Sequence, residues 1–311
     1  MAYSQLAMKQ APEIYDYLSR EEIAAFSEKS DLRAWGTLLV QIALLVAAFA
    51  LVVLWPNPLT IVLAILLLGG RIQAWGVLAH DCAHGAFFRT PWLNQFVGRW
   101  IVGAAGHVPL DAYRRYHLDH HKHAGTPDDP DKWMVKNYPI ARSSLKRKFQ
   151  RDLTGRTGFR DFLREFNSFT WEANGPTVLF HLLLAGTLAA FGAPWAYLLY
   201  WAARLFIYPA IHRLRQISEH GVVPNRDVLD ARLNTGTTIP RWWERLFIAP
   251  CNVNYHLEHH IFASVPPYRL PQLHRTLVER GYYKGHDCIA HGFADVLRRA
   301  TRPEPQEPVR A

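Results

Sequence analysis

Histidines stand at spacings that suit metal binding in three places along the chain. The stretch YHLEHHIF at 255–262 places His256, His259 and His260 at positions i, i+3 and i+4, which share one face of a helix. Histidine is a mediocre helix former, so helix propensity does not account for the pattern. Imidazoles that charge near neutral pH would repel one another without a shared partner. The spacing therefore indicates that three imidazoles converge on a metal ion.

The same spacing occurs in two earlier segments. HDCAHG begins at His80 and has histidines at i and i+4, and HLDHH begins at His117 and repeats the i, i+3, i+4 pattern. The three histidine boxes together supply more imidazoles than the roughly four ligands of a zinc site. The adjacent pairs at 120/121 and 259/260 suit two neighbouring ions. The predicted ligands are His80, His84, His117, His120, His121, His256, His259 and His260.

The ligand type does not by itself choose the metal. Imidazole without thiolate is compatible with iron, zinc, copper or nickel, and a membrane setting with redox chemistry favours iron. Each box also contains an acid, namely Asp81, Asp119 and Glu258. Such a carboxylate can accept the second N–H of a ligating imidazole, although solvated surface charge is the alternative explanation. His220, in the stretch RQISEHG, is ambiguous on spacing alone.

Long apolar runs must position these boxes at a membrane. Residues 34–55 carry no charge and are about enough to cross a bilayer core of roughly 30 Å as a helix. A second run at 59–79 follows after three residues, which predicts a hairpin, and its Arg71 can snorkel or face protein. A third apolar region is interrupted at 192–194. It predicts a second hairpin, with spans at 177–191 and 195–211.

These runs predict an all-α membrane protein with two transmembrane hairpins, hence four spans, and a cytoplasmic helical cap that carries the three boxes. The short apolar segment 95–110 contains Arg99 and His107, so we expect it to be re-entrant or interfacial. The expected divisions are a cytoplasmic segment 1–32, a membrane domain 33–300 and a disordered, proline-rich tail 301–311. Within the membrane domain, 80–175 and 212–300 are expected to be cytoplasmic.

The distribution of charge predicts the orientation. The net charge is +9, and basic residues are dense in 85–174 but absent from the two hairpin links. By the positive-inside rule, this region, both termini and all three boxes face the cytoplasm. We expect the membrane to be the inner membrane of a bacterium. The positive charge could also attract anionic membrane lipids or an acidic protein. Binding of nucleic acid is not needed to explain this charge.

Several common features are missing from the sequence. Residues 1–32 contain no apolar core of the length that a cleavable signal peptide needs. The three cysteines form no CxxC pair, and their odd number in a reducing cytoplasm argues against disulfides. No glycine-rich dinucleotide loop or phosphate-binding loop occurs. Any reductant must therefore act through another protein.

The motifs HDCAHG, HLDHH and HLEHH around two hydrophobic hairpins resemble the three histidine boxes of the membrane fatty acid desaturase family, over roughly residues 35–290. The stretch IFASVPPYRLPQLH is similar to that of acyl-lipid desaturases without a fused cytochrome domain. The resemblance implies two Fe ions that activate O2, a lipid or fatty acyl substrate, and electrons from a ferredoxin or a cytochrome with its reductase. It also adds His220 to the ligands. Gln216 stands where some members have an asparagine that acts through water.

Other readings remain open. Hydroxylation or ketolation of a lipid or carotenoid uses the same kind of centre. Box one resembles the HExxH helix of an intramembrane metalloprotease with aspartate for glutamate, and a nonenzymatic metal carrier is another possibility. A front-end desaturase is not expected, because box three begins with His256 and 32 residues precede the first span. We expect HDCIAHG at His286 to be a packing helix and His274 to be structural.

Overall fold

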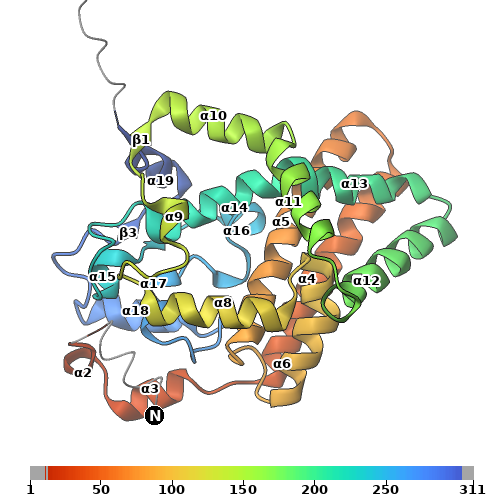
Figure 1. Cartoon of the computed structure of the whole chain (residues 1–311). Helices are drawn as coiled ribbons and strands as arrows, with labels where there is room; N and C mark the ends of the chain where they lie inside the picture. The colour runs from red at the N-terminus through yellow and green to blue at the C-terminus, as the bar shows by residue number, and fades with distance from the viewer. Residues whose placement is uncertain (1–10, 12, 303–311) are drawn as a thin grey trace, which may run out of the picture.

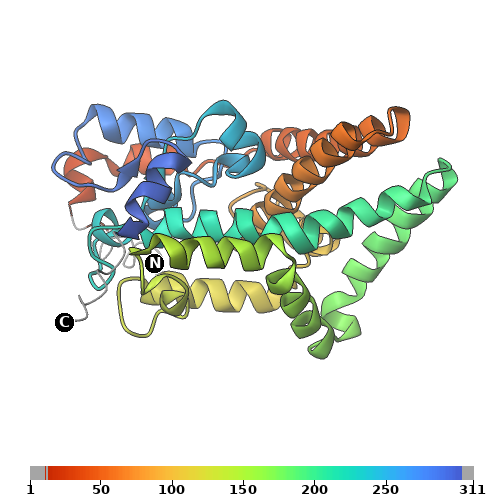
Figure 2. The same cartoon turned by 90° about the horizontal axis from the view of Figure 1, so that it is seen from above.

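Three helices are long and apolar enough to cross a membrane. In this computed structural model, which describes residue 11 and residues 13–302, they are α4 (Asp31–Leu54), α5 (Pro58–Ala83) and α12 (Trp171–Ala190). Figure 1 shows α4 beside α5, and Figure 2 shows the α4–α5 hairpin and the α12–α13 hairpin projecting toward the same side. The chain is a mostly helical membrane protein whose apolar helices leave one end of a folded cap.

The first hairpin closes through a capped turn. The side-chain oxygen of Asn57 accepts the backbone N–H groups of Leu59 and Thr60, both at 3.1 Å. Pro58 occupies the first helical position, where its missing N–H costs nothing. At its other end, α5 continues four residues past the predicted limit of 79, to Ala83. Box one therefore begins on the last turn of a membrane helix.

Helix α12 begins at Trp171, six residues before the predicted start of the third span at 177. Pro176 lies inside the helix, where it cannot donate to the carbonyl four residues earlier. That carbonyl belongs to Glu172, and the Nη2 atom of Arg99 donates to it at 2.7 Å. The guanidinium supplies the hydrogen bond that the proline removes, so the helix continues through the proline.

The predicted fourth span corresponds to a helical run with two π segments. It comprises α13 (Tyr197–Ala202), η3 (Ala203–Ile207), α14 (Tyr208–Gln216) and η4 (Ile217–Gly221), preceded by the 3-10 helix η2 (Pro194–Ala196). Three arginines lie in the run, at 204, 213 and 215. Among the described residues the criterion of length and apolarity selects only α4, α5 and α12. The fourth span therefore stays a prediction.

The segment predicted as re-entrant forms short helices packed against α5. They are α6 (Pro91–Val97), η1 (Gly98–Val102) and α7 (Gly103–Gly106). Gly106 permits this close packing, because a Cβ on it would meet the backbone nitrogen of Gly76 and the Cβ of Trp75, each at 3.1 Å. Helix α8 (Leu110–His123) follows and carries box two away from the spans.

The cap is built from short helices around an apolar core. The core includes Leu257, Ile261, Leu273, Leu277 and Tyr282, each at most 1% exposed. The remaining helices of the described chain are α2 (Ile14–Tyr17), α3 (Arg20–Phe26), α9 (Lys132–Val135), α10 (Arg142–Leu153), α11 (Arg156–Asn167), α15 (Ala231–Asn234), α16 (Trp242–Phe247), η5 (Pro250–Asn252), α17 (His256–Ile261), α18 (Leu270–Glu279) and α19 (Phe293–Arg299).

Two small parallel sheets tie the cap together. Strand β1 (Ile140–Ala141) pairs with β4 (Thr301–Arg302), and β2 (Thr237–Thr238) pairs with β3 (Ile289–Ala290). The first pairing corrects the prediction of a disordered tail from residue 301, because the backbone of β4 is held by β1. Residues 303–311 of that predicted tail lie outside the described residues.

Replacing Gly70 by alanine should loosen the cap from the spans. A Cβ on Gly70 would lie 3.0 Å from the carbonyl oxygen of Leu246 and from the backbone of Phe247, where α16 crosses α5. Overpacking of this kind typically costs about 1–3 kcal/mol, which exceeds the gain of roughly 1 kcal/mol in helix propensity. We expect a lower midpoint of thermal unfolding. The matched control is Gly76→Ala on the same helix, which meets no atom within 4 Å and should be neutral or stabilising.

Candidate metal centre

Nine histidines gather in two clusters. In each cluster the potential ligand atoms lie within 4.8 Å of one another, and the nine residues are those predicted as ligands from the sequence and the family resemblance. Cluster one consists of His80, His84, His117, His121 and His259, and cluster two consists of His120, His220, His256 and His260. The clusters join the end of α5 to α8, η4 and α17.

Helix geometry divides the paired histidines between the two clusters. On α8, His117 and His121 are one helical turn apart and both enter cluster one, whereas His120 enters cluster two. On α17, His259 enters cluster one and His260 enters cluster two. The rings of His121 and His260 stack with their centroids 4.2 Å apart. The two clusters are therefore adjacent.

Ring nitrogens face one another inside each cluster. The Nε2 atom of His121 lies 3.1 Å from Nε2 of His117 and 3.1 Å from Nε2 of His259. In cluster two, Nε2 of His220 lies 3.1 Å from Nε2 of His256. Two imidazoles bound to one ion at about 2.1 Å hold their nitrogens roughly 3.0–3.4 Å apart. The observed spacing fits nitrogens that share an ion.

The protonation and hydrogen bonding of the histidine rings also fit a bound metal. Burial, and then the charges of neighbouring imidazoles, hold the pKa of His117, His259 and His260 well below its usual value, so the rings are neutral. Within the described chain, both ring nitrogens of His84 and of His260 are buried without a hydrogen-bond partner. A buried polar atom without a partner is costly. A metal ion is a group that would satisfy these nitrogens.

Acceptors outside cluster two orient its rings. The Nδ1 atom of His120 lies 2.7 Å from Asp129 and 3.7 Å from Asp131. Burial alone would lower the pKa of His120, but the hydrogen bond with Asp129 and the charge of Asp131 raise it. His220 donates from Nδ1 to the carbonyl of Asn234 at 3.1 Å. In both rings a proton held on Nδ1 leaves Nε2 free to bind a metal.

Two further carboxylates lie beside histidines of the clusters. Asp81 is 2.9 Å from Nδ1 of His80. Glu219, which the sequence reasoning did not single out, is 3.5 Å from Nδ1 of His256 and accepts a hydrogen bond from Arg215. The buried carboxylate thus joins a guanidinium to the outer side of cluster two.

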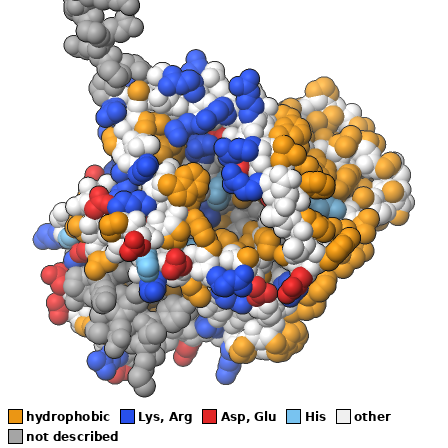
Figure 3. Space-filling view, in the orientation of Figure 1, with side chains coloured by type: hydrophobic (Ala, Val, Ile, Leu, Met, Phe, Trp, Pro, Cys, Tyr) orange, Lys and Arg blue, Asp and Glu red, His pale blue; other side chains and the backbone are white. Residues whose placement is uncertain are grey.

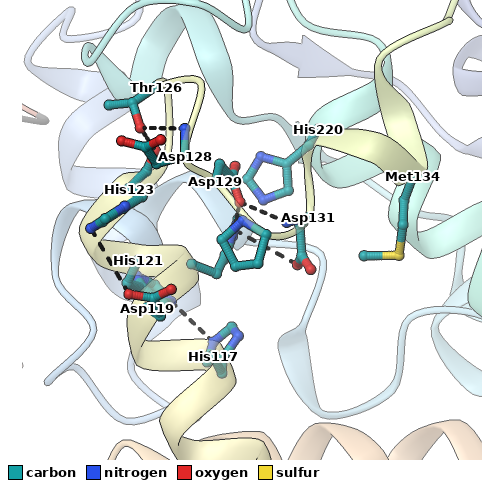
Figure 4. A network of polar contacts seen from close by, with 12 residues as sticks. His117, Asp119, His121, His123, Thr126, Asp128, Asp129, Asp131, Met134 and His220 are labelled. Carbon is teal, nitrogen blue, oxygen red and sulfur yellow. Dashed lines mark hydrogen bonds and ion pairs between the residues drawn. The ribbon is translucent and has the colours of Figure 1, made fainter.

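Two residues predicted to support the ligands lie elsewhere. Asp119 was predicted to accept from a ligating imidazole, and that prediction is wrong. Its side chain is about half exposed and lies 3.9 Å from His123, one turn along the surface of α8, as Figure 4 shows. Gln216 donates from its amide to the sulfur of Met134 at 2.9 Å. That contact does not involve a ligating imidazole.

Glu258 was also predicted to contact a ligand, and it does not. It stands between the ligands of α17 in sequence, but its carboxylate binds Thr237, Nδ1 of His274 and the hydroxyl of Tyr283. Residue 258 is two positions from His256 and from His260, so it points to the other side of the helix. Its carboxylate is completely buried and anchors α17 to β2 and α18.

We expect Glu258→Gln to destabilise the fold while leaving the activity per bound metal unchanged. A carboxylate accepts from all three donors, whereas an amide turns its own N–H2 toward at least one of them. Leaving buried donors unsatisfied costs about 1–3 kcal/mol, measurable as a lower unfolding midpoint. Asp119→Asn, at an exposed position, should change neither quantity. A loss of roughly 10–100-fold in activity per metal, which is typical of a lost partner of a metal ligand, would contradict this assignment.

The histidines of HDCIAHG do not enter either cluster. The predicted packing helix is wrong, because residues 289–290 form strand β3, and the N–H of Thr237 donates to the carbonyl of Cys288 at 2.9 Å. His291 is exposed. His274, predicted to be structural, contacts Glu258 rather than a ligand.

Comparison with known protein families finds one match that covers most of the chain. Residues 56–291 match the family described as fatty acid desaturase. This range contains all nine clustered histidines and the acceptors that orient them.

Curated proteins show the same likeness. The chain is 25% identical over 283 residues to the sn-1 oleoyl-lipid 12-desaturase of Synechocystis sp., covering 81% of this chain and 78% of the relative. It is 24% identical over 277 residues to the protein of the same name from Picosynechococcus sp., covering 80% of this chain and 78% of the relative. A shorter match, 33% over 81 residues, covers 26% of this chain and 21% of the sn-1 acyl-lipid omega-3 desaturase (ferredoxin) of Nostoc sp..

Proposed function

The chain belongs to the fatty acid desaturase family, and we propose that its two histidine clusters hold two iron ions that serve the family's reaction. The protein is an oxidoreductase that introduces a double bond into a fatty acyl chain. The observation that carries the iron proposal is the division of nine imidazoles, seven of them on buried residues, between two adjacent clusters. Hydroxylase, ketolase, protease and metal-carrier functions are not favoured, because the relatives are named desaturases.

Bound iron would supply an oxidant able to remove hydrogen from an unactivated C–H bond, which side-chain acids and bases cannot do. The reaction balances when the acyl chain gives up two hydrogens from neighbouring carbons and forms one C=C bond. An external donor supplies two electrons, solvent supplies two protons, and O2 leaves as two molecules of water.

The protein's own residues would hold and orient the ligands during this reaction. Asp129 and the carbonyl of Asn234 keep protons on Nδ1 of His120 and His220, so that the opposite nitrogens stay free for the metal. Asp81 does the same for His80. Burial of both clusters excludes water from the ligand atoms.

We infer that the substrate is an acyl chain of a membrane lipid and that the electron donor is a ferredoxin. The Synechocystis relative is named for an oleoyl lipid and the Nostoc relative for ferredoxin. The basic region at 85–174 and the uncharged link at 56–58 favour a cytoplasmic site in a bacterial inner membrane. In that arrangement the chain crosses four times, at α4, at α5, at α12 and along the run from α13 to α14.

Expression in a bacterial host with a simple fatty acid profile tests the reaction. Mass spectrometry of the total lipids should find acyl chains lighter by two hydrogen atoms, because two C–H bonds break and both oxygen atoms of O2 leave as water. The vector without the gene is the control. Products heavier by one oxygen atom, or carrying a ketone, would instead indicate a hydroxylase or ketolase.

A further inference from the structure

The surface of α10 carries a group of cations without carboxylate partners. Figure 3 shows Lys and Arg side chains gathered over this helix, next to the apolar surface of the spans. The one acid of the helix, Asp152, is completely buried and bound to Arg213 of α14. Within the described chain, five basic residues of α10 and one at the start of α11 form no ion pair. They are Arg142, Lys146, Arg147, Lys148 and Arg151 of α10 and Arg156 of α11, which we call the α10 surface.

The α10 surface has the form of a binding site for anionic side chains. An open groove of about 570 Å³ is lined by four of its cations together with hydroxyl and amide groups. On the neighbouring helix α11, Arg160 is neutralised by Asp161 at 3.0 Å. The α10 cations have no such carboxylate partner within the described chain, and unneutralised charge of one sign steers partners of the opposite sign toward a surface.

Short connections lead from this surface to cluster two. The ammonium of Lys148 lies 5.9 Å from the ring centre of Tyr138. Arg226 donates to the backbone carbonyl of Tyr138 and, at 3.1 Å, to that of the ligand His220. Arg213, which binds α10 through Asp152, precedes His220 by seven residues on one helical run, or about 10 Å. Two residues, Tyr138 and Arg226, therefore connect the α10 surface to the predicted ligand His220.

We propose that the α10 surface docks an acidic electron-donor protein, an inference that rests on the proposed function. Each docking delivers one electron toward cluster two, so two dockings supply the two electrons that reduce O2 alongside the two hydrogens taken from the acyl chain. The reduced donor is oxidised in each event, and solvent provides the protons. Carboxylates around the donor's redox centre would pair with the α10 cations and fix its orientation.

The direction of α10 favours a protein partner over a bilayer. Figure 2 shows α10 lying along α14, which continues through η3 into the α13 end of the second hairpin. A bilayer that surrounds the hairpins would meet only the end of α10 near Leu153. The other end of α10, which begins at Arg142, lies away from the hairpins, and Arg142 and Lys146 are exposed there to a partner in solution.

The double variant Arg147→Glu and Arg151→Glu tests the docking. The full chain in nanodiscs of zwitterionic lipid is supplied either with reduced plant-type ferredoxin or with a small viologen reductant, and double-bond formation is measured. We expect the KM for ferredoxin to rise on the order of tenfold or more, while the rate with viologen stays unchanged. For the parent protein, KM should rise with ionic strength between about 0.05 and 0.3 M. That dependence should weaken in the variant.

The matched control is Arg275→Glu and Lys284→Glu, which reverses two exposed charges of the cap outside α10. An unchanged KM in the α10 variant, or an equal rise in the control, would overturn the docking surface while leaving the proposed function intact. An effect seen only in nanodiscs of anionic lipid would also overturn it, by assigning the surface to lipid headgroups. If the parent protein formed no double bond with either reductant, the proposed function itself would fail.

Discussion

Replacing His259 by alanine should abolish double-bond formation. Its ring packs against those of His80, His84 and His121, and its Nε2 atom lies 3.1 Å from that of His121. Removing it opens cluster one on the side of α17 and leaves neighbouring buried nitrogens without their shared partner. Loss of a residue that merely supports a ligand typically costs roughly 10–100-fold, and loss of the ligand should exceed this. Lipid mass spectrometry after expression gives the readout.

The control for this variant is His291→Ala, which removes an exposed histidine outside both clusters. It should leave activity and expression unchanged. The His259→Ala variant must also still fold. Extraction of a normal amount of the variant from the membrane, in a single oligomeric state, would establish this. Retention of more than a tenth of the activity in a folded variant would contradict the role of His259 as a ligand.

Removing the metal with a chelator should abolish activity and lower the unfolding temperature together. The clustered histidines come from α5, α8, η4 and α17, which are far apart in the chain, so bound ions would link these elements. In small zinc fingers the bound metal is worth about 10–16 kcal/mol, and even a fraction of this value would be visible as a shift of several degrees. Without metal, the buried imidazoles lose the partner that offsets their desolvation.

Reloading with different metals separates structure from chemistry. Iron(II) should restore both the unfolding temperature and the activity. Zinc should restore the temperature alone, because it accepts the same nitrogen ligands but has no redox chemistry. An unfolding temperature that chelation leaves unchanged, or full activity with zinc, would contradict the account.

Much of the site could be predicted from the sequence because its ligands stand at helical spacing. Histidines one turn apart must share a face, so box two and box three each predicted convergent imidazoles. The apolar runs likewise predicted α4 and α5, because an apolar stretch of that length has no stable place in water, even with the single Arg71 of the second run. His220 needed more than spacing, since it is the only predicted ligand in its segment; the family resemblance supplied it.

The acids were harder to predict because their partners lie in other segments. Asp129 and Asp131 lie in the segment that follows box two, and this segment folds back so that both carboxylates lie near His120. Only the tertiary structure determines how that segment folds back. For Glu258 the error was the opposite one, because this acid is adjacent to the clustered histidines in sequence but does not contact them. It was assigned to the ligands by adjacency in sequence, although a residue two positions from His256 and from His260 points to the other side of the helix.

The start of α12 could not be placed for a similar reason. A proline inside an apolar run indicates a boundary when only local rules apply. Here Arg99, from a segment more than seventy residues earlier, donates to the carbonyl that Pro176 cannot serve. A distant side chain thus cancels a local signal, and no window of sequence around 176 contains that information.

The most direct test of the central claim is the iron content of the purified, folded protein expressed with iron supplied. The two clusters predict two iron ions per chain. They also predict that His259→Ala, which opens cluster one, retains about one ion in cluster two. A parent protein that binds a single ion, or that is fully active with zinc at both positions, would contradict the assignment of the nine histidines to a di-iron centre.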